Sequence, residues 1–302
     1  MTTVSAYEKE IMMQLEYLKN FKPQKILSDI KQKRAIFCGT GDSYASALLA
    51  EVFSRFRARA YDPLDFLKNR DLLHNHDLYL ISISGNTISN IKLGKLSKNS
   101  TAITANSNSR LAKACKNRIS LEFPNTGIQT SGSISFLSSA LACISLVSQF
   151  KISDVLKIFR HAKKAAKKIS LHGKVYILGN LHTMPLALFF AAKLHEVLGM
   201  DAQYERIEQF SHAGLFATKK GDTIIILEEK NSHNEKLLNH LRKCNLDAIR
   251  IVPPKTNILG KTLFFIFVSE LIALYTAKKK RKKECYFIEA KDLKNVSSSM
   301  IY

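Results

Sequence analysis

Residues 34–43 read Arg-Ala-Ile-Phe-Cys-Gly-Thr-Gly-Asp-Ser, a short apolar run that ends in glycine and opens into a polar loop. A stretch with helical spacing, 44–53, follows it. A buried strand that leads through a glycine into a helix is the start of a βα unit on a parallel sheet. The pattern returns at Lys174-Val-Tyr-Ile-Leu-Gly179, before a helical stretch over 184–198, and the offset between the two glycines is 179 − 39 = 140 residues.

The repeat continues beyond this first unit. Two further pairs of apolar runs match between the halves, 77–83 with 222–227 and 101–104 with 247–252, and each half ends in an apolar helix, 134–147 and 261–275. Two successive sets of strands and helices predict an α/β protein with two doubly wound parallel sheets flanked by helices. We expect a first domain over 1–152, which includes an N-terminal helix, and a second over 153–302, which includes a charged connecting helix and the C-terminal tail.

Size and composition are typical of a globular protein from a reducing compartment. The chain has 302 residues, 46% of them hydrophobic, which is enough for one large core or two domains. Its five cysteines are widely spaced and include no Cys-x-x-Cys pair, unlike a disulfide framework or a zinc site. The start shows no secretory signal pattern, and the apolar, uncharged stretch 134–150 is too short and serine-rich for a membrane span. We therefore expect a cytoplasmic protein that does not bind membranes.

The net charge of +21 needs an explanation. Such a charge can indicate a nucleic acid or an anionic membrane surface as partner, or simply lysines spread over solvated helix faces. Much of the excess is scattered, one dense run stands at 278–283, and no helix-turn-helix segment or aromatic-basic interleaving accompanies it. The pattern favours a solvated basic surface over nucleic-acid binding, and such a surface would also attract anionic small molecules.

Polar, glycine-containing loops follow two strands of the first half, at the carboxyl ends where parallel sheets bind ligands. One is Gly39-Thr-Gly-Asp-Ser43 and the other is Ser82-Ile-Ser-Gly-Asn-Thr87. Glycine lets backbone N–H groups approach an anion, hydroxyls add donors, and the start of the next helix adds a favourable dipole. Ordinary helix capping by Ser or Thr is the alternative. Two such loops together favour a phosphate site with these candidate ligands: Gly39, Thr40, Gly41, Ser43, Ser82, Ser84, Gly85 and Thr87.

The corresponding loops of the second half are Gly179-Asn-Leu-His-Thr183 and Glu228-Glu-Lys-Asn231. The second of these is acidic and lacks the hydroxyl cluster. We therefore expect the second half to keep the fold without the phosphate site.

The two loops of the first half resemble the signature of the sugar isomerase (SIS) domain family. The tandem arrangement looks like the isomerase half of glucosamine-6-phosphate synthase and like the archaeal phosphoglucose/phosphomannose isomerases. The resemblance implies a sugar-phosphate substrate and a homodimer. We expect neither a metal nor another cofactor, because the histidines form no ligand pattern with carboxylates and Gly39-Thr-Gly41 lacks the third glycine of a dinucleotide fingerprint.

The resemblance also points to three catalytic residues. In that family the second domain supplies a glutamate from its first helix and a histidine about sixteen residues later. Lys193-Leu-His-Glu196 and Gln209-Phe-Ser-His212 match these motifs, with 212 − 196 = 16. The family also uses a lysine in its C-terminal tail, for which Lys294 is the candidate. The synthases carry His-Gly-Pro where this chain has His212-Ala-Gly, and with no cysteine at position 2 and no glutaminase domain we expect no glutaminase activity.

These residues suit an aldose–ketose isomerase, which moves a proton between C1 and C2 of a sugar phosphate through an enediol. A carboxylate with a modestly raised pKa, Glu196, would be the base, His212 would open the ring, and Lys294 would stabilise developing charge. Two alternatives stay open. One is a deaminase or deglycase that releases an amine from a phosphosugar, and the other is a non-catalytic sugar-phosphate sensor.

Overall fold

The computed structural model describes residues 1–302, except for the side chain of Leu72. The chain divides into two compact units, each assembled from separate segments. The first-sheet unit comprises 19–125, 132–151 and 290–302, and the second-sheet unit comprises 1–18, 126–131 and 152–289. The domain boundary expected between residues 152 and 153 stays a prediction.

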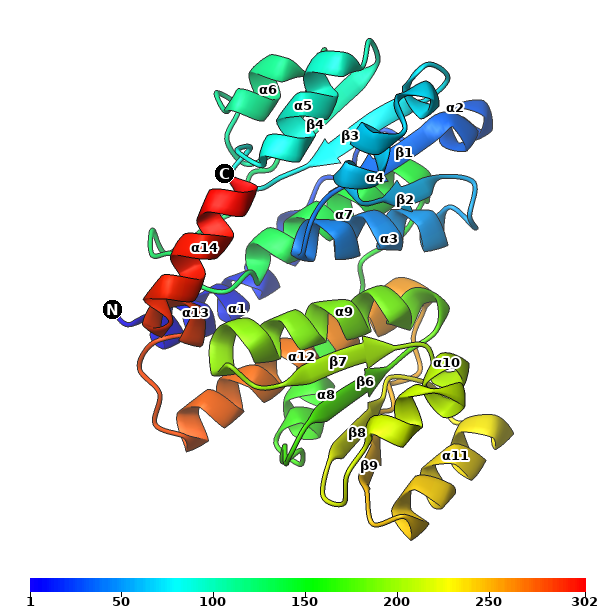
Figure 1. Cartoon of the computed structure of the whole chain (residues 1–302), viewed down its shortest axis with the longest axis vertical. Helices are drawn as coiled ribbons and strands as arrows, with labels where there is room; N and C mark the ends of the chain where they lie inside the picture. The colour runs from blue at the N-terminus through cyan, green and yellow to red at the C-terminus, as the bar shows by residue number, and fades with distance from the viewer. The chain divides into compact units, whose positions relative to one another are not determined.

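The first-sheet unit contains five parallel strands in the order β2-β1-β3-β4-β5 (Figure 1). The strands are β1 Ala35–Cys38, β2 Arg59–Tyr61, β3 Asp77–Ile81, β4 Ser100–Thr104 and β5 Asn117–Ser120. The helices are α2 Asp29–Arg34, α3 Asp42–Phe53, α4 Pro63–Lys68, the 3₁₀ turn η1 Arg70–Leu73, α5 Ile88–Leu96, α6 Arg110–Ala114, α7 Ile134–Val147 and α14 Lys291–Ile301.

Both faces of the first sheet are covered, which is why its inner strand β1 is apolar and buried throughout. Helices α4, α5 and α6 bury Phe66, Leu93 and Leu111 against Leu78 and Leu80 of the sheet. Helices α3 and α7 pack together on the other face, where the hydroxyls of two serines join them at 2.8 Å. Each fully buried leucine or phenylalanine contributes about 1.5–3 kcal/mol to this packing.

The second-sheet unit contains four parallel strands in the order β7-β6-β8-β9. The strands are β6 Val175–Leu178, β7 Ala202–Glu205, β8 Thr223–Ile226 and β9 Asp247–Arg250. The helices are α1 Thr3–Asn20, α8 Val155–Ala166, η2 Leu181–Thr183, α9 Met184–Lys193, the π-helical turn η3 Leu194–Leu198, α10 Ile207–His212, η4 Gly214–Ala217, α11 Ser232–Lys243, α12 Ile258–Lys279 and α13 Tyr286–Glu289.

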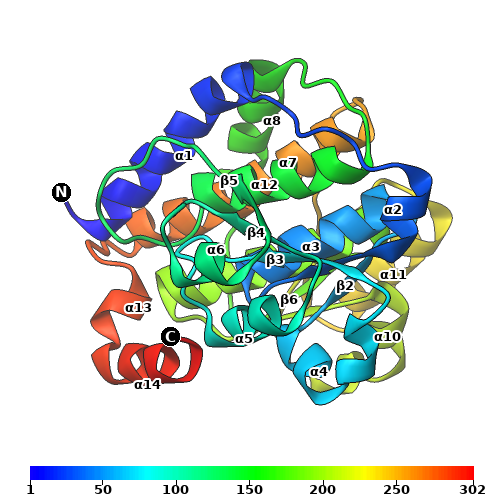
Figure 2. The ribbon, with the colours of Figure 1, turned by 90° about the horizontal axis from the view of Figure 1, so that it is seen from above.

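Helices α10 and α11 cover one face of the second sheet, and α9 covers the other together with α12. Helix α8 packs on α12, with the rings of Phe159 and Phe267 edge to face at 5.1 Å. Helix α1 lies beside α12 (Figure 2), where Nε2 of Gln14 donates to both carboxylate oxygens of Glu270 at 2.8 and 2.9 Å.

The α/β prediction and its two parallel sheets flanked by helices are confirmed. The repeat extends to detail: a Cβ on Gly39 would lie 2.6 Å from the backbone of Ser43, and one on Gly179 would lie 2.7 Å from the backbone of Thr183. Both glycines therefore let the chain turn tightly from strand to helix at equivalent positions. The three-residue strand β2, together with β5 and β7, was not predicted.

Helix α12 is long and apolar enough to cross a membrane, judged by length and composition alone. Its most apolar window is 83% buried inside the protein, as in the core helix of a globular fold. The cytoplasmic location stays a prediction.

Candidate functional site

The first sheet has its topological switch point between β1 and β3. The chain crosses from β1 to β2 on one side and from β3 to β4 on the other, so the loops after β1 and β3 diverge at the carboxyl edge. Ligands of doubly wound sheets bind in this crevice. Both loops singled out in the sequence, 39–43 and 82–87, lie there, so the fold brings their candidate ligands to one edge of one sheet.

Hydroxyls hold the 82–87 loop in shape. The Oγ of Ser82 and the Oγ1 of Thr87 are 3.0 Å apart, and the backbone N–H of Gly85 donates to the Oγ of Ser82 at 3.1 Å. Ser82 and Thr87 are buried, whereas Ser84 is exposed and accepts from the N–H of Asn86 at 3.3 Å. A hydroxyl has one donor and two acceptor sites, so these contacts leave capacity for a ligand.

Two glycines of these loops have a positive φ, a backbone conformation that other residues rarely adopt. Gly85 has φ +67°, and a Cβ there would lie 2.1 Å from the Oγ of Ser109. Gly41 has φ +56°, but a Cβ there would meet nothing within 4 Å. Gly85 is thus required by close packing and by its backbone, while Gly41 is required by its backbone alone and leaves open space beside the loop.

The helices that start at the switch point lack side-chain caps. Neither Gly41 before α3 nor Thr87 before α5 caps its helix with a side chain, whereas Asp62 caps α4 and Ser109 caps α6. The hydroxyl of Thr87 instead faces Ser82. The capping alternative considered for this loop therefore does not describe Thr87. In α3 the N–H groups of Ser43 and Tyr44 donate to the carbonyls of Thr40 and Gly41, whereas α5 begins without a side-chain cap from Thr87.

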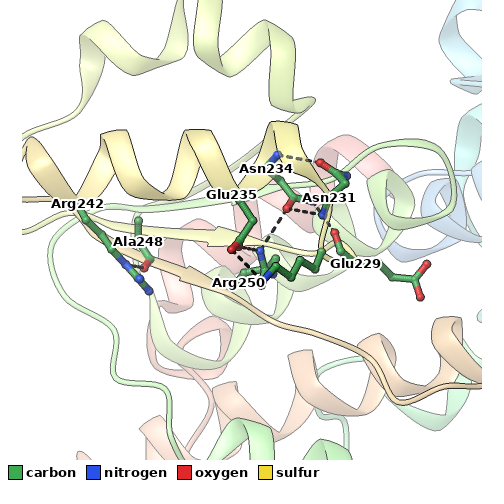
Figure 3. Close-up of polar contacts among 8 residues, drawn as sticks. Glu229, Asn231, Asn234, Glu235, Arg242, Ala248 and Arg250 are labelled. Atoms are coloured by element: carbon green, nitrogen blue, oxygen red, sulfur yellow. Dashed lines mark hydrogen bonds and ion pairs between the residues drawn. The ribbon is translucent and has the colours of Figure 1, made fainter.

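The switch point of the second sheet, between β6 and β8, is built differently (Figure 3). Asn231 and Asn234 form a reciprocal cap on α11, and the side chain of Asn234 donates to the carbonyl of Glu229 at 2.5 Å. The carboxylate of Glu229 pairs with Lys261 at 2.8 Å. Burial raises the pKa of the neighbouring Glu228. A capped helix and two carboxyl groups make this edge unsuited to a phosphate.

Glu196 lies in the π-helical turn that ends the first helix of the second sheet. Its Oε2 accepts from the Oγ of Ser131 at 2.6 Å and from the Nζ of Lys193 at 2.7 Å. The Nζ of Lys193 also donates to Ser131 at 2.9 Å and lies 5.0 Å from the ring centroid of Phe189. Lys193 is fully buried, while the Glu196 side chain is 40% exposed. Because both hydrogen bonds engage Oε2, Oε1 is the oxygen available to a ligand.

The pKa of the Glu196 carboxyl is lowered, not raised as the proposed base role led us to expect. Burial acts to raise it, but the charge and hydrogen bond of Lys193 and the hydrogen bond from Ser131 outweigh burial. The carboxylate is consequently ionised throughout the neutral pH range. π-Helical turns are rare and occur often at functional sites, so the π-turn at Glu196 is consistent with a functional role for this residue.

The structure does not bring Glu196 and His212 together within one chain. Helix α9 runs back from the carboxyl edge of the second sheet, so Glu196 lies near the amino edge, before β7 begins. Helix α10, which ends at His212, starts at the carboxyl edge after β7 and covers the opposite face. Strand β7 alone spans about 13 Å. Within one chain the two residues thus lie toward opposite edges of the second sheet, and their joint action on one sugar stays a prediction.

His212 is exposed at the end of α10. Lys294 is half-buried in α14, which belongs to the first-sheet unit. Sequence reasoning missed two residues that hold Glu196, namely Lys193 and Ser131. Lys193 could have been found from its spacing of three residues to Glu196 on a helix, whereas nothing in the sequence connects Ser131 to them.

Comparisons with known proteins place the fold. No family model matches the sequence, and no curated protein matches it. Among solved structures, glucosamine-6-phosphate deaminase from Thermotoga maritima superposes with a TM-score of 0.75 at 19% identity, over 93% of this chain and 95% of that one. The C-terminal domain of glucosamine-fructose-6-phosphate aminotransferase from Francisella tularensis gives 0.70 at 18% identity, over 90% and 95%.

Tagatose-6-phosphate ketose/aldose isomerase from Escherichia coli gives a TM-score of 0.67 at 16% identity, over 93% of this chain and 90% of that one. The chain therefore has, over nearly its whole length, the α/β fold of these phosphosugar isomerase and deaminase structures. At this level of identity the likeness establishes the fold.

Proposed function

We propose that this protein is a phosphosugar aldose–ketose isomerase of the SIS family, with one SIS domain around each sheet. The phosphate binds at the 39–43 and 82–87 loops, and Glu196, His212 and Lys294 carry out the chemistry. The observation that carries the proposal is the pair of helices, α3 and α5, that begin without side-chain caps beside a hydroxyl-rich loop. The positive ends of these two helix dipoles, together with the N–H groups at the start of α5, favour a dianionic phosphate there.

In this mechanism the ionised Oε1 of Glu196 takes the proton from C2 of the open-chain aldose and returns it to C1. The lowered pKa makes Glu196 a weaker base but keeps it in the required protonation state at neutral pH. Lys294 stabilises the enediolate oxygen, and His212 donates and accepts the protons that open the ring. Because His212 and Glu196 lie on opposite faces of their sheet, we propose that His212 acts in the site of a second copy of the chain.

The test is a panel of hexose 6-phosphates and amino-sugar phosphates incubated in D₂O and followed by NMR. An enediol mechanism exchanges the transferred hydrogen with solvent, so deuterium should enter at C2 of the aldose or C1 of the ketose of one substrate. Glu196→Gln should abolish this exchange. Absence of exchange and of isomerised product across the panel would refute the isomerase.

A deaminase is the second candidate, and the likeness of fold to the glucosamine-6-phosphate deaminase structure favours it. Ammonia release from glucosamine 6-phosphate, measured in the same incubations, distinguishes the two reactions. Tight binding of several phosphosugars without turnover of any would favour the sensor.

A further inference from the structure

A cavity of about 470 Å³ lies in the first-sheet unit, away from the candidate phosphate loops. Its walls include Lys33, Phe56, Arg57, Arg59, Tyr61 and His76. All but Tyr61 lie in the chain just before, or at the first residue of, β1, β2 or β3. The cavity is therefore at the amino edge of the parallel sheet, whereas the 39–43 and 82–87 loops are at the carboxyl edge. Its volume is within the range of small-molecule sites.

The cavity walls are cationic. No carboxylate is among the described residues that line it. The carboxylates on flanking elements are already engaged, Asp29 with Arg57 at 2.9 Å and Asp77 with Arg34 at 3.8 Å. Neither Lys33 nor Arg59 forms an ion pair with a described residue, so no direct carboxylate partner holds either of these two cations at the cavity. Such a pair favours an anionic ligand.

The same cavity exposes aromatic rings. Phe56 is 42% exposed and Tyr61 is 37% exposed. The ring of Tyr61 is fixed edge to face against the buried Phe66, with centroids 5.1 Å apart. Exposed rings beside unpaired cations suit a ligand that has both a flat ring and a phosphate group.

Backbone strain holds Phe56 at this position. Arg55 and Phe56 have φ of +56° and +62°, a region that side chains other than glycine rarely occupy. The turn ends α3, and the N–H of Phe56 donates to the carbonyl of Glu51 at 2.9 Å. Glycine is the usual residue in such a helix-ending turn. Strained residues of this kind cluster at ligand sites, where the strain positions a side chain.

We propose that the amino-edge cavity binds a mononucleotide, with its phosphate on Arg59 and Lys33 and its base against Phe56 and Tyr61. The site is separate from the sugar-phosphate site. It would make the protein responsive to a second, nucleotide ligand, and the inference does not rest on the proposed isomerase activity.

The experiment is isothermal titration calorimetry of the full chain with ATP, AMP, adenosine and inorganic phosphate. We expect AMP or ATP to bind at one site per chain. Adenosine, which lacks the anion, and phosphate, which lacks the ring, should each bind at least about tenfold more weakly. Arg59→Ser should weaken nucleotide binding by about tenfold or more. Lys113→Ser, which removes an exposed charge on α6, is the matched control and should leave binding unchanged.

Phe56→Gly separates binding from folding. Glycine relieves the left-handed strain, so this variant should unfold at the same or a higher temperature than the parent while binding nucleotide more weakly. The double variant Ser84→Ala, Thr87→Ala should still bind nucleotide. The proposal is overturned if no nucleotide binds, or if adenosine or phosphate binds as tightly as AMP. It is also overturned if the variants at Arg59 and Phe56 bind normally, or if the 84/87 variant loses nucleotide binding.

Discussion

Replacing Lys193 with methionine should destabilise the fold by leaving Glu196 as a partly buried carboxylate without its cation. The variant keeps an unbranched apolar stem but loses the Nζ and with it two hydrogen bonds, at 2.7 Å to Glu196 and 2.9 Å to Ser131. Removing one partner of a buried ion pair costs about 3–5 kcal/mol. Because the Glu196 side chain is 40% exposed, water screens the charge that remains. We expect a loss of about 1–3 kcal/mol at neutral pH.

The pH dependence gives the sharper test. In the parent protein the folded-state pKa of Glu196 is lowered, so the pair stabilises the fold above the unfolded pKa of about 4.3. That stabilisation is lost as the pH falls through the folded-state pKa. In Lys193→Met, burial raises the Glu196 pKa instead, so folding then disfavours the ionised form. The penalty of the substitution should be largest near neutral pH and shrink at acid pH, where Glu196 is neutral in both states.

Urea unfolding at neutral and acid pH measures these free energies for the parent, Lys193→Met, Glu196→Gln and the double variant. Adding Glu196→Gln to Lys193→Met should recover part of the loss at neutral pH, because it removes the unpaired charge. A penalty that is equal at both pH values, with no recovery in the double variant, would refute the electrostatic account and leave only lost packing.

Three further outcomes are expected. Ser84→Ala and Thr87→Ala should each weaken sugar-phosphate binding by about 1–3 kcal/mol in calorimetry, and unchanged affinity would remove the 82–87 loop from the site. Sedimentation at micromolar concentration should give a dimer of the 34.0 kDa chain. A monomer at this concentration would contradict the prediction. Glu196→Gln and His212→Asn, each inactive alone, should recover about one quarter of the parent activity when mixed and allowed to exchange subunits, since half of the dimers then carry one intact site. If no activity returns, Glu196 and His212 either act in the same chain or do not both belong to the active site.

The sequence predicted the elements that are buried on both sides. Helix α7 was predicted with the bounds it has, and β1 and β6 within one residue at each end, because their apolar runs are uninterrupted. Strands β2 and β7 were missed because they lie at sheet edges and consist largely of exposed or half-buried polar residues, so they carry no apolar run. A hydrophobic pattern reveals only strands that are buried. An edge strand forms because its backbone pairs with the neighbouring strand, which leaves no such pattern in its side chains.

The candidate site was predictable to the same extent. Glycines and hydroxyls close together in sequence located the 39–43 and 82–87 loops, because each loop is one contiguous segment. The contact of Ser131 with Glu196 joins residues 65 positions apart and depends on a π-turn, which no local pattern specifies. The direction of the Glu196 pKa was wrong for the same reason, since Lys193 and Ser131 supply the stabilisation that reverses the effect of burial.

The two switch points of this chain differ in helix capping and charge, although both sheets are parallel. At the first, α3 and α5 begin uncapped beside hydroxyls, an arrangement that suits an anion. At the second, Asn231 caps α11 and Glu229 is paired with Lys261, so the polar groups at this edge already have partners within the protein. The proposed catalytic groups of the second unit, Glu196 and His212, lie elsewhere and on opposite faces of its sheet. If both groups serve one sugar, one of them comes from another copy. Diluting the protein to single chains should then abolish turnover while leaving phosphate binding intact.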